Sequence, residues 1–313
     1  MISMRYHIMS IAAVFLALAL GIFLGATKVQ SPILVGNQDE NAQLTAQRDA
    51  LQQQNTDLSA QVASDQRLAG SVSQLAVRGT LPKATVVLIS TQDADPGDRD
   101  AIVGLLGKAG AKVTSQLQLT QNFTDPGRSS ELESLVAKSV PAGKGVLPDV
   151  ASAGTMTGAL LGSVLVTDPA GKTAASATDA TTALSALSGA GYLTASGTQT
   201  PGRLVLVLTG GKQSGGSEAD RAAAVADLAT QLKKSAGGVV VVGRDGSATP
   251  QGVVGAVRGD GIRSQAVSTV DDANTTAGQL AAVLALVEQN GGGVGQYGSG
   301  TGAQGPVPAL AVG

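Results

Sequence analysis

The sequence RLVLVL, Arg203–Leu208, is apolar at every residue after the arginine, and it sets the expected fold class. Two similar runs are ATVVLIS at Ala84–Ser90 and VVVV at Val239–Val242. Short runs rich in β-branched residues predict strands, and apolar side chains on both faces predict a sheet that is covered on both sides. The core of this protein is therefore expected to be an aliphatic sheet between helices.

Patterns with helical spacing lie between these runs, and two weaker strand patterns accompany them. The expected helices are Asp98–Ala109, Met156–Leu165, Ala180–Ser188, Ser217–Lys234 and Ala277–Glu288, and the weaker strands are Lys112–Thr120 and Gln265–Val270. Strands that alternate with helices form mainly parallel sheets. We expect a Rossmann-like, three-layer α/β domain over residues 80–290, followed by a glycine-rich flexible tail over residues 291–313.

Composition excludes several classes of function. The chain has 313 residues, with 21 Lys+Arg against 23 Asp+Glu, and this balance lacks the positive charge that nucleic-acid binding requires. It has no cysteine and a single histidine, His7, so disulfides, thiolate metal sites, cysteine nucleophiles and histidine triads cannot form. We expect a non-enzymatic protein without a cofactor.

Near the N-terminus, Ile8–Ala26 reads IMSIAAVFLALALGIFLGA and carries no charge. This length suits a helix that crosses the lipid core, so residues 1–30 are predicted to be a retained transmembrane signal anchor in contact with membrane lipid. The alternative is a signal peptide that is cleaved after the small-residue triplet at 17–19. The anchor residues singled out are Ile8, Phe15, Gly21 and Gly25, of which the two glycines form a GxxxG pair.

The charges beside this span predict its orientation. Arg5 precedes the apolar stretch, and Lys28 alone follows it closely. Positive charge favours the cytoplasmic side, so we expect a single pass through the cytoplasmic membrane with the bulk of the chain outside the cytoplasm.

Residues 31–79 are polar and permit a helix. Leu44, Leu51, Leu58 and Val72 fall in the d column of a heptad pattern, and Val62 falls in the largely polar a column. This pattern predicts a coiled-coil stalk that pairs as a parallel homodimer. The alternative is a single solvated helix.

Ligands of such sheets bind beyond the carboxyl ends of the strands, so the loops there are the place to look for function. The loop TGGKQSGGS, Thr209–Ser217, could hold an anion on its backbone amides, although it lacks the Walker A spacing. Carboxylates follow two strands, and the possible ligand residues are Asp93, Asp95, Asp271 and Asp272. Those after the first strand could bind Mg²⁺ or Ca²⁺, but helix capping is the favoured interpretation.

A small cluster beside the membrane has the chemistry of a Cu(I) site. Met4, His7 and Met9 bring thioethers and the single imidazole together, and both ligand types suit Cu(I). The competing interpretation is ordinary interfacial residues near an initiator methionine, and it is the one we favour.

Three segments give the chain a family resemblance. They are SMRYHIMSIAAVFLALALGIFLGA (Ser3–Ala26), VSTVDDANTTAGQLAAVLAL (Val267–Leu286) and the GQYG sequence at 295–298. With the glutamine-rich stalk, they resemble the actinobacterial copper transport protein B family. The resemblance implies a channel for copper efflux across the mycobacterial outer membrane. It also implies, from relatives described as cell-division factors, a membrane partner that bears a thiamine-pyrophosphokinase-like domain.

These two implications predict different molecules. A β-barrel pore needs long alternating strands and aromatic girdles, whereas this chain has no tryptophan, three Phe and three Tyr. From the residues, we expect a dimeric envelope scaffold that engages an envelope or cell-division partner. Copper efflux through an outer-membrane channel is kept as the alternative.

Overall fold

The computed structural model describes residues 4–141 and 151–309, without the side chains of residues 4–5 and 27–40. The chain divides into two units, Met1–Asp65 and Gln66–Gly313. The second unit therefore begins 14 residues before the predicted domain start at residue 80, because the end of the N-terminal helix belongs to it.

Helix α1 (Met4–Val77) makes up the described part of the first unit as far as Asp65. The remaining turns of the same helix belong to the second unit. Within α1, Tyr6–Ala26 is long and apolar enough to cross a membrane, judged by length and composition, and none of it is buried. Since an aliphatic surface of this length is unstable in water, it requires lipid or protein around it.

The second unit is built on a seven-stranded sheet in the order β3-β2-β1-β4-β5-β6-β7. Every neighbouring pair is parallel except β2 with β3, which is antiparallel. The strands are β1 (Thr85–Thr91), β2 (Lys112–Leu119), β3 (Leu193–Ala195), β4 (Leu204–Leu208), β5 (Gly238–Val242), β6 (Ser268–Val270) and β7 (Gln296–Tyr297). The predicted α/β class with a mainly parallel sheet is confirmed; a closer Rossmann-like relationship stays a prediction.

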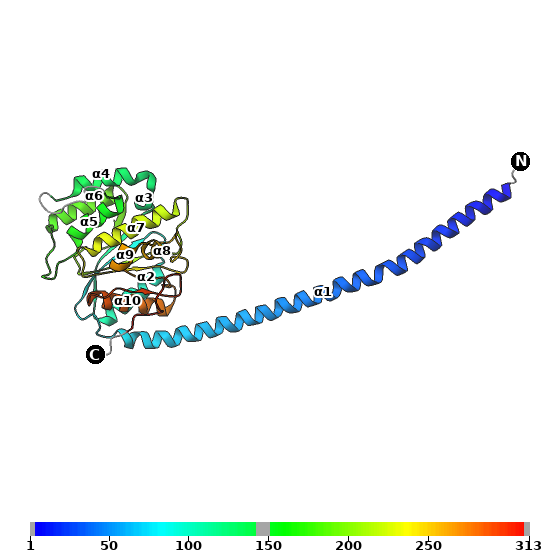
Figure 1. Ribbon diagram of the computed structural model, residues 1–313, viewed down its shortest axis with the longest axis horizontal. Coiled ribbons are helices and arrows are strands. Elements are labelled where there is room, and N and C mark those ends of the chain that lie inside the picture. The colour runs from blue at the N-terminus through cyan, green and yellow to red at the C-terminus, as the bar shows by residue number, and fades with distance from the viewer. Residues whose placement is uncertain (1–3, 142–150, 310–313) are drawn as a thin grey trace. The chain divides into compact units, whose positions relative to one another are not determined.

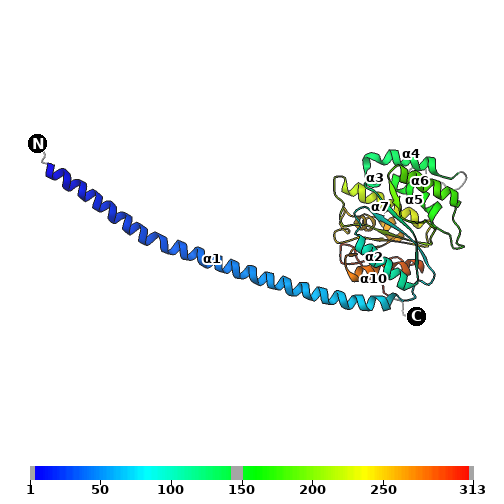
Figure 2. The same ribbon diagram turned by 180° about the vertical axis from the view of Figure 1, so that it is seen from behind.

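Helices cover both faces of this sheet. They are α2 (Pro96–Ala109), α3 (Gln121–Thr124), α4 (Ser129–Ser139), α5 (Ala153–Leu165), α6 (Ala177–Gly189), α7 (Glu218–Lys233), α8 (Val253–Arg258), α9 (Gly261–Ala266) and α10 (Thr276–Asn290), with a 3₁₀ turn at Pro126–Arg128. Figures 1 and 2 show α2 and α10 together on one side of the sheet and the helices α4 to α7 on the other.

The two hydrophobic cores explain why the strand sequences are continuously apolar. Val205 and Val207 pack in the core that includes helices α5 and α7, whereas Leu204, Leu206 and Leu208 pack in the core that includes α2 and α10. Successive side chains of a strand point to opposite faces, so both sets must be apolar when helices lie on both sides.

The end of α1 packs on this second core. Val77 is fully buried among residues of α2 and α10, and Ser73, one turn earlier, is also buried. Val72, which was predicted to lie in the dimer seam, is 54% exposed. One face of the last two turns of α1 therefore packs on the α/β unit, and Val72 lies on the exposed face.

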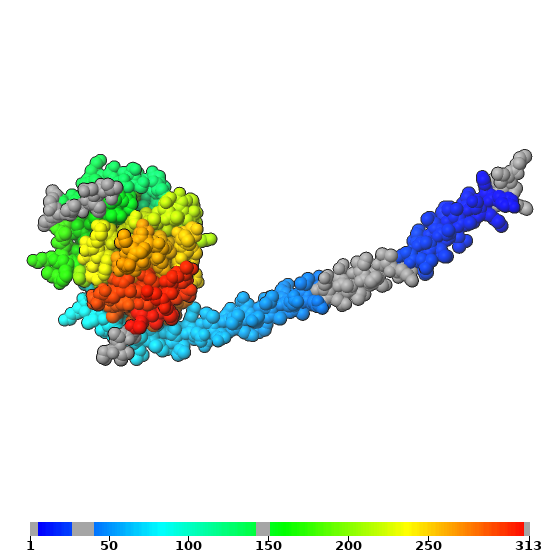
Figure 3. Space-filling view, in the orientation of Figure 1, coloured from blue at the N-terminus to red at the C-terminus, as the bar shows by residue number. Residues whose placement is uncertain are grey.

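The structure differs from the predicted fold at one strand boundary and in two short strands that were not predicted, β3 and β7. The expected strand Gln265–Val270 is only Ser268–Val270, because helix α9 continues to Ala266. The C-terminal segment, expected to be flexible, adds strand β7 beside β6. In the space-filling view this red segment lies against the orange residues that precede it in the chain (Figure 3).

Side chains from distant parts of the sequence hold this C-terminal segment. The buried carboxylate of Asp271 accepts hydrogen bonds from the amides of Ser299 (2.9 Å) and Gly300 (3.0 Å). Arg258 pairs with Asp271 and donates to the Tyr297 carbonyl at 2.7 Å. These contacts offset the entropy cost of ordering a glycine-rich chain. The composition of the segment does not show that such contacts exist.

Candidate functional site

A cavity of about 550 Å³ opens at the carboxyl ends of β1, β2 and β4. Its lining comes from the residues that follow these three strands and from the first turn of α7. The lining residues are Thr91, Gln92, Asp93, Thr120, Gln121, Thr124, Lys212, Gln213, Ser214, Gly215 and Arg221.

The strand order explains why a cavity forms there. From β1 the chain passes through α2 to β2 on one side, whereas from β4 it passes through α7 to β5 on the other side. Because α2 and α7 lie on opposite faces of the sheet, the loops after β1 and β4 diverge. Such a switch point is where open parallel sheets bind their ligands.

Asp93 forms one side of the cavity. Its carboxylate accepts a hydrogen bond from the Thr91 hydroxyl and another from the Gln213 amide at 3.1 Å. A Cβ atom at Gly210 would lie 2.5 Å from an Asp93 oxygen, so only glycine allows this close approach. The carboxylate is thus fixed, but it has no cationic partner within 4 Å among the described residues.

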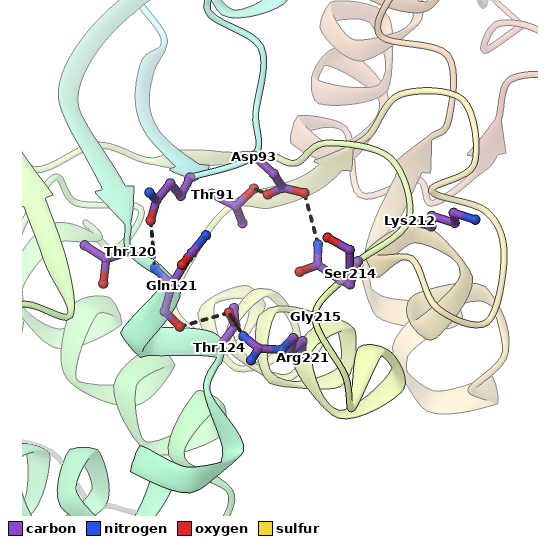
Figure 4. Close-up of a pocket in the computed structure, with 11 residues that line it drawn as sticks. Thr91, Asp93, Thr120, Gln121, Thr124, Lys212, Ser214, Gly215 and Arg221 are labelled. Atoms are coloured by element: carbon purple, nitrogen blue, oxygen red, sulfur yellow. Dashed lines mark hydrogen bonds between the residues drawn. The ribbon is translucent and has the colours of Figure 1, made fainter.

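Arg221 forms the opposite side, as Figure 4 shows. Its guanidinium donates to the Gly216 carbonyl at 2.9 Å and to the Thr124 hydroxyl at 3.4 Å. Both acceptors are neutral, and no ion pair of Arg221 occurs within 4 Å in the described parts of the chain. The positive charge is therefore held in place without being neutralised by direct contact.

The first turn of α7 and the loop before it carry two further charged groups. Glu218 accepts a hydrogen bond from the Gly216 amide at 3.0 Å. The bond to its own amide and the bond to Gly216 lower the pKa of Glu218, and the charges of Arg221 and Lys212 lower it further. Lys212 is exposed at the rim, and its side chain points away from Asp93 and Arg221 in Figure 4. The loop amide thus already holds an anionic oxygen, supplied by the chain itself.

The predicted ligand residues after β1 separate into two roles. Asp93 lines the cavity, whereas Asp95 caps α2 by accepting from the amides of Gly97 (2.7 Å) and Asp98 (3.3 Å). Arg244 then contacts both carboxylates, at 3.2 Å from Asp95 and 2.8 Å from Asp98. The capping interpretation is confirmed for Asp95.

The two carboxylates after β6 are not in this cavity. Asp271 holds the C-terminal segment, as described above. Burial, and then the neighbouring charge of Asp271, raise the pKa of Asp272 to about 6, and its Oδ1 atom has no hydrogen-bond partner among the described residues. No group of three or more His, Cys, Asp or Glu side chains suited to a metal occurs in the described residues.

The remaining predicted residues lie in the first unit. Ile8, Phe15, Gly21 and Gly25 are on the apolar part of α1, where no other described residue contacts the space above the two glycines. His7 and Met9 are exposed on the same helix, and the side chain of Met4 lies outside the described residues. The seam residues Leu44, Leu51, Leu58 and Val62 are all more than half exposed.

Sequence reasoning identified the loops after β1 and β4 but missed part of the cavity. Thr120 and Thr124, which follow β2, and Arg221 in α7 were not singled out. The signal that could have found them is topological: β2 adjoins β1, so its carboxyl end must lie beside Asp93.

Comparisons with known proteins identify relatives along almost the full length. The family described as "Copper transport outer membrane protein, MctB" matches residues 1–308. Proteins named copper transporter MctB from Mycobacterium tuberculosis and Mycobacterium bovis are 35% identical over 309 residues, covering 97% of this chain and 98% of each relative. The protein of that name from Mycobacterium leprae is 33% identical over 321 residues, with the same coverage. The resemblance noted in the sequence is thus confirmed, and the chain belongs to the MctB copper transport family.

Proposed function

We propose that this chain is a non-enzymatic, membrane-anchored envelope protein in which two copies pair through their stalks. The anchor is the Tyr6–Ala26 part of α1, and the α/β unit is the part that reaches an envelope partner outside the cytoplasm. Family membership supports a role in the cell envelope, since the family is described as an outer membrane protein. The copper-transport name of the relatives bears on the second candidate below.

The observation that carries this proposal is the exposed leucine column. Leu44, Leu51 and Leu58 recur at seven-residue spacing in α1 and are 61%, 65% and 54% exposed in the single chain. Exposed leucines on one edge of a helix are stabilised when a second helix covers them. A second copy is the natural occupant, because it brings an identical column in the same register.

The test is the mass of the detergent-solubilised full chain in sedimentation. Leu51→Asp with Leu58→Asp should convert a dimer into a monomer, because two buried charges would oppose pairing. The control is Gln53→Asp with Ala60→Asp, which places the same charges seven residues apart on the side of the helix away from the leucine column, and this variant should remain a dimer. A dimer of unchanged mass in the leucine variant would refute pairing through the stalk.

Copper transport is the second candidate, and the family description favours it. One apolar helix per chain forms no wide pore unless several chains assemble. Conductance of the purified full chain in planar bilayers tests this function directly. Copper-carrying channels would support it, and silent bilayers together with wild-type copper tolerance in a deletion strain would contradict it.

The partner in the envelope is identified only through the family resemblance. A membrane protein with a thiamine-pyrophosphokinase-like domain is the candidate, and it would contact the stalk or the α/β unit. Crosslinking in living cells from single positions on each unit tests this choice. Capture of a different protein from both units would replace the candidate.

A further inference from the structure

We propose that the cavity between Asp93 and Arg221 binds a small phosphorylated polyol, with the phosphate at Arg221 and a hydroxyl group at Asp93. This function is separate from pairing and anchoring, which involve the first unit. The inference rests on the position of the cavity, its polar lining and the arrangement of opposite charges across it.

The volume and lining suit a polar molecule. A cavity of about 550 Å³ is within the range of small-molecule sites. Its contributing side chains are hydroxyls, amides and charged groups rather than aromatic or aliphatic ones. A hydrophobic ligand would leave these donors and acceptors without partners, which costs binding free energy.

The phosphate end is defined by Arg221. Its guanidinium is held by Gly216 and Thr124, so little side-chain freedom remains to be lost when an anion binds. Arginine forms strong charge-assisted hydrogen bonds with phosphate oxygens. Lys212 at the rim adds a second positive charge on a flexible side chain that can turn toward a bound anion.

The hydroxyl end is defined by Asp93. A carboxylate repels a phosphate but accepts hydrogen bonds from hydroxyl groups, and this one is fixed by Thr91 and Gln213. Asp93 and Arg221 lie on opposite sides of the cavity (Figure 4), so a ligand that spans the cavity would meet both groups. A molecule with both groups therefore satisfies the cavity better than inorganic phosphate or an uncharged sugar does.

The experiment measures binding to the full chain in detergent by calorimetry, with four probes. Glucose 6-phosphate and glycerol 3-phosphate carry both groups, whereas inorganic phosphate and glucose each lack one. We expect both phosphorylated polyols to bind with a dissociation constant below about 1 mM, and the other two more weakly. Tighter binding of glucose 6-phosphate indicates a soluble sugar phosphate, and tighter binding of glycerol 3-phosphate indicates a phospholipid headgroup.

Substitutions of Arg221 and Asp93 test which residue binds the phosphate and which binds the hydroxyl group of the ligand. Arg221→Gln should weaken binding of every phosphate probe about tenfold, because a charge-assisted hydrogen bond is lost. Asp93→Asn should weaken the probes that carry hydroxyl groups and leave inorganic phosphate unaffected or slightly tighter. Lys234→Gln, which removes an exposed positive charge at the far end of α7, is the control and should bind like the wild type.

Two outcomes would overturn the inference. One is the absence of binding of either phosphorylated polyol by the wild type at millimolar concentration. The other is equal affinity of wild type, Arg221→Gln and Asp93→Asn when circular dichroism shows that all three are folded. Neither outcome affects the proposed dimer, which sedimentation tests independently.

Discussion

Leu16 and Leu51 in the first unit are each 65% exposed, whereas Leu204 and Leu206 in β4 are completely buried. The same residue type thus meets two different environments in one chain. In the α/β unit the protein supplies its own apolar surroundings, and the free energy of burial stabilises the sheet. In the first unit the apolar surface requires lipid or protein around it, so the state of that unit depends on its surroundings.

Breaking the buried ion pair of the second unit should cost the most stability. Asp271→Ala would leave Arg258, whose side chain is 6% exposed, without its counter-charge and would release the C-terminal segment. We expect the free energy of unfolding to fall by about 3–5 kcal/mol. Urea unfolding followed through the near-ultraviolet signal of Tyr192 and Tyr297 measures this loss.

The matched control is an exposed pair of the same chemistry. Asp100→Ala removes the partner of Arg99, and the Asp100 side chain is 71% exposed. Exposed pairs contribute at most about 1 kcal/mol, so this variant should unfold almost like the wild type. Equal losses in the two variants would contradict the role given to Asp271.

A pair of leucine substitutions tests whether the two units differ in what their apolar residues contribute to stability. Leu206→Ala should lower the free energy of unfolding of the α/β unit by about 2–5 kcal/mol, because it leaves a cavity in a fully buried strand. Leu16→Ala should leave the urea midpoint of that unit unchanged, since Leu16 contributes nothing to its core. A shift in the midpoint for Leu16→Ala would show that the two units are coupled energetically.

The smallest expected effect is a pH dependence. Burial raises the pKa of Asp272 from 3.8 to about 6, so the folded state favours the protonated carboxyl. The stabilisation is complete below the unfolded pKa and is lost as the pH rises through the folded pKa. The unfolding free energy should therefore fall by up to about 3 kcal/mol between about pH 4 and about pH 6.

Asp272→Asn isolates this contribution, because the amide does not titrate. The difference in unfolding free energy between wild type and variant should change over that pH range and be constant above about pH 7. A difference that does not change between about pH 4 and about pH 6 would exclude Asp272 as the titrating group. Burial also raises the pKa of Asp98, which adds a dependence of the same sign to both proteins.

The central strands could be predicted from the sequence because each is apolar on both faces. The runs LVLVL and VVVV must be covered by helices on both sides, because all of their side chains are apolar. This can be predicted from each short run alone. Strand β3 was missed because it has three residues, two of them exposed, at the edge of the sheet. Strand β7 was missed because its position depends on contacts with Arg258, Asp271 and Glu288, which are distant in the sequence. The glycine-rich composition of the segment does not indicate these contacts.

The candidate site was predictable only in part, for a related reason. Asp93 and the loop after β4 could be located because both follow recognisable strands. In the sequence, Arg221 has the pattern of any polar residue of an amphipathic helix. Its role in the cavity becomes visible only when α7 is known to lie on one face of the sheet, with the residues after β2 next to Arg221. Binding sites at a switch point join loops that are distant in sequence, so their members cannot be paired without the strand order.

We propose that α1 crosses a membrane once and leaves the rest of the chain outside the cytoplasm, and cysteine labelling tests this topology most directly. Because the chain contains no cysteine, single cysteines report accessibility without background. In intact protoplasts, a membrane-impermeant maleimide should label Gln54→Cys and Lys234→Cys, while Arg5→Cys should react only after permeabilisation. Labelling of Arg5→Cys alone in intact protoplasts, with the other two positions protected, would show the opposite orientation of α1.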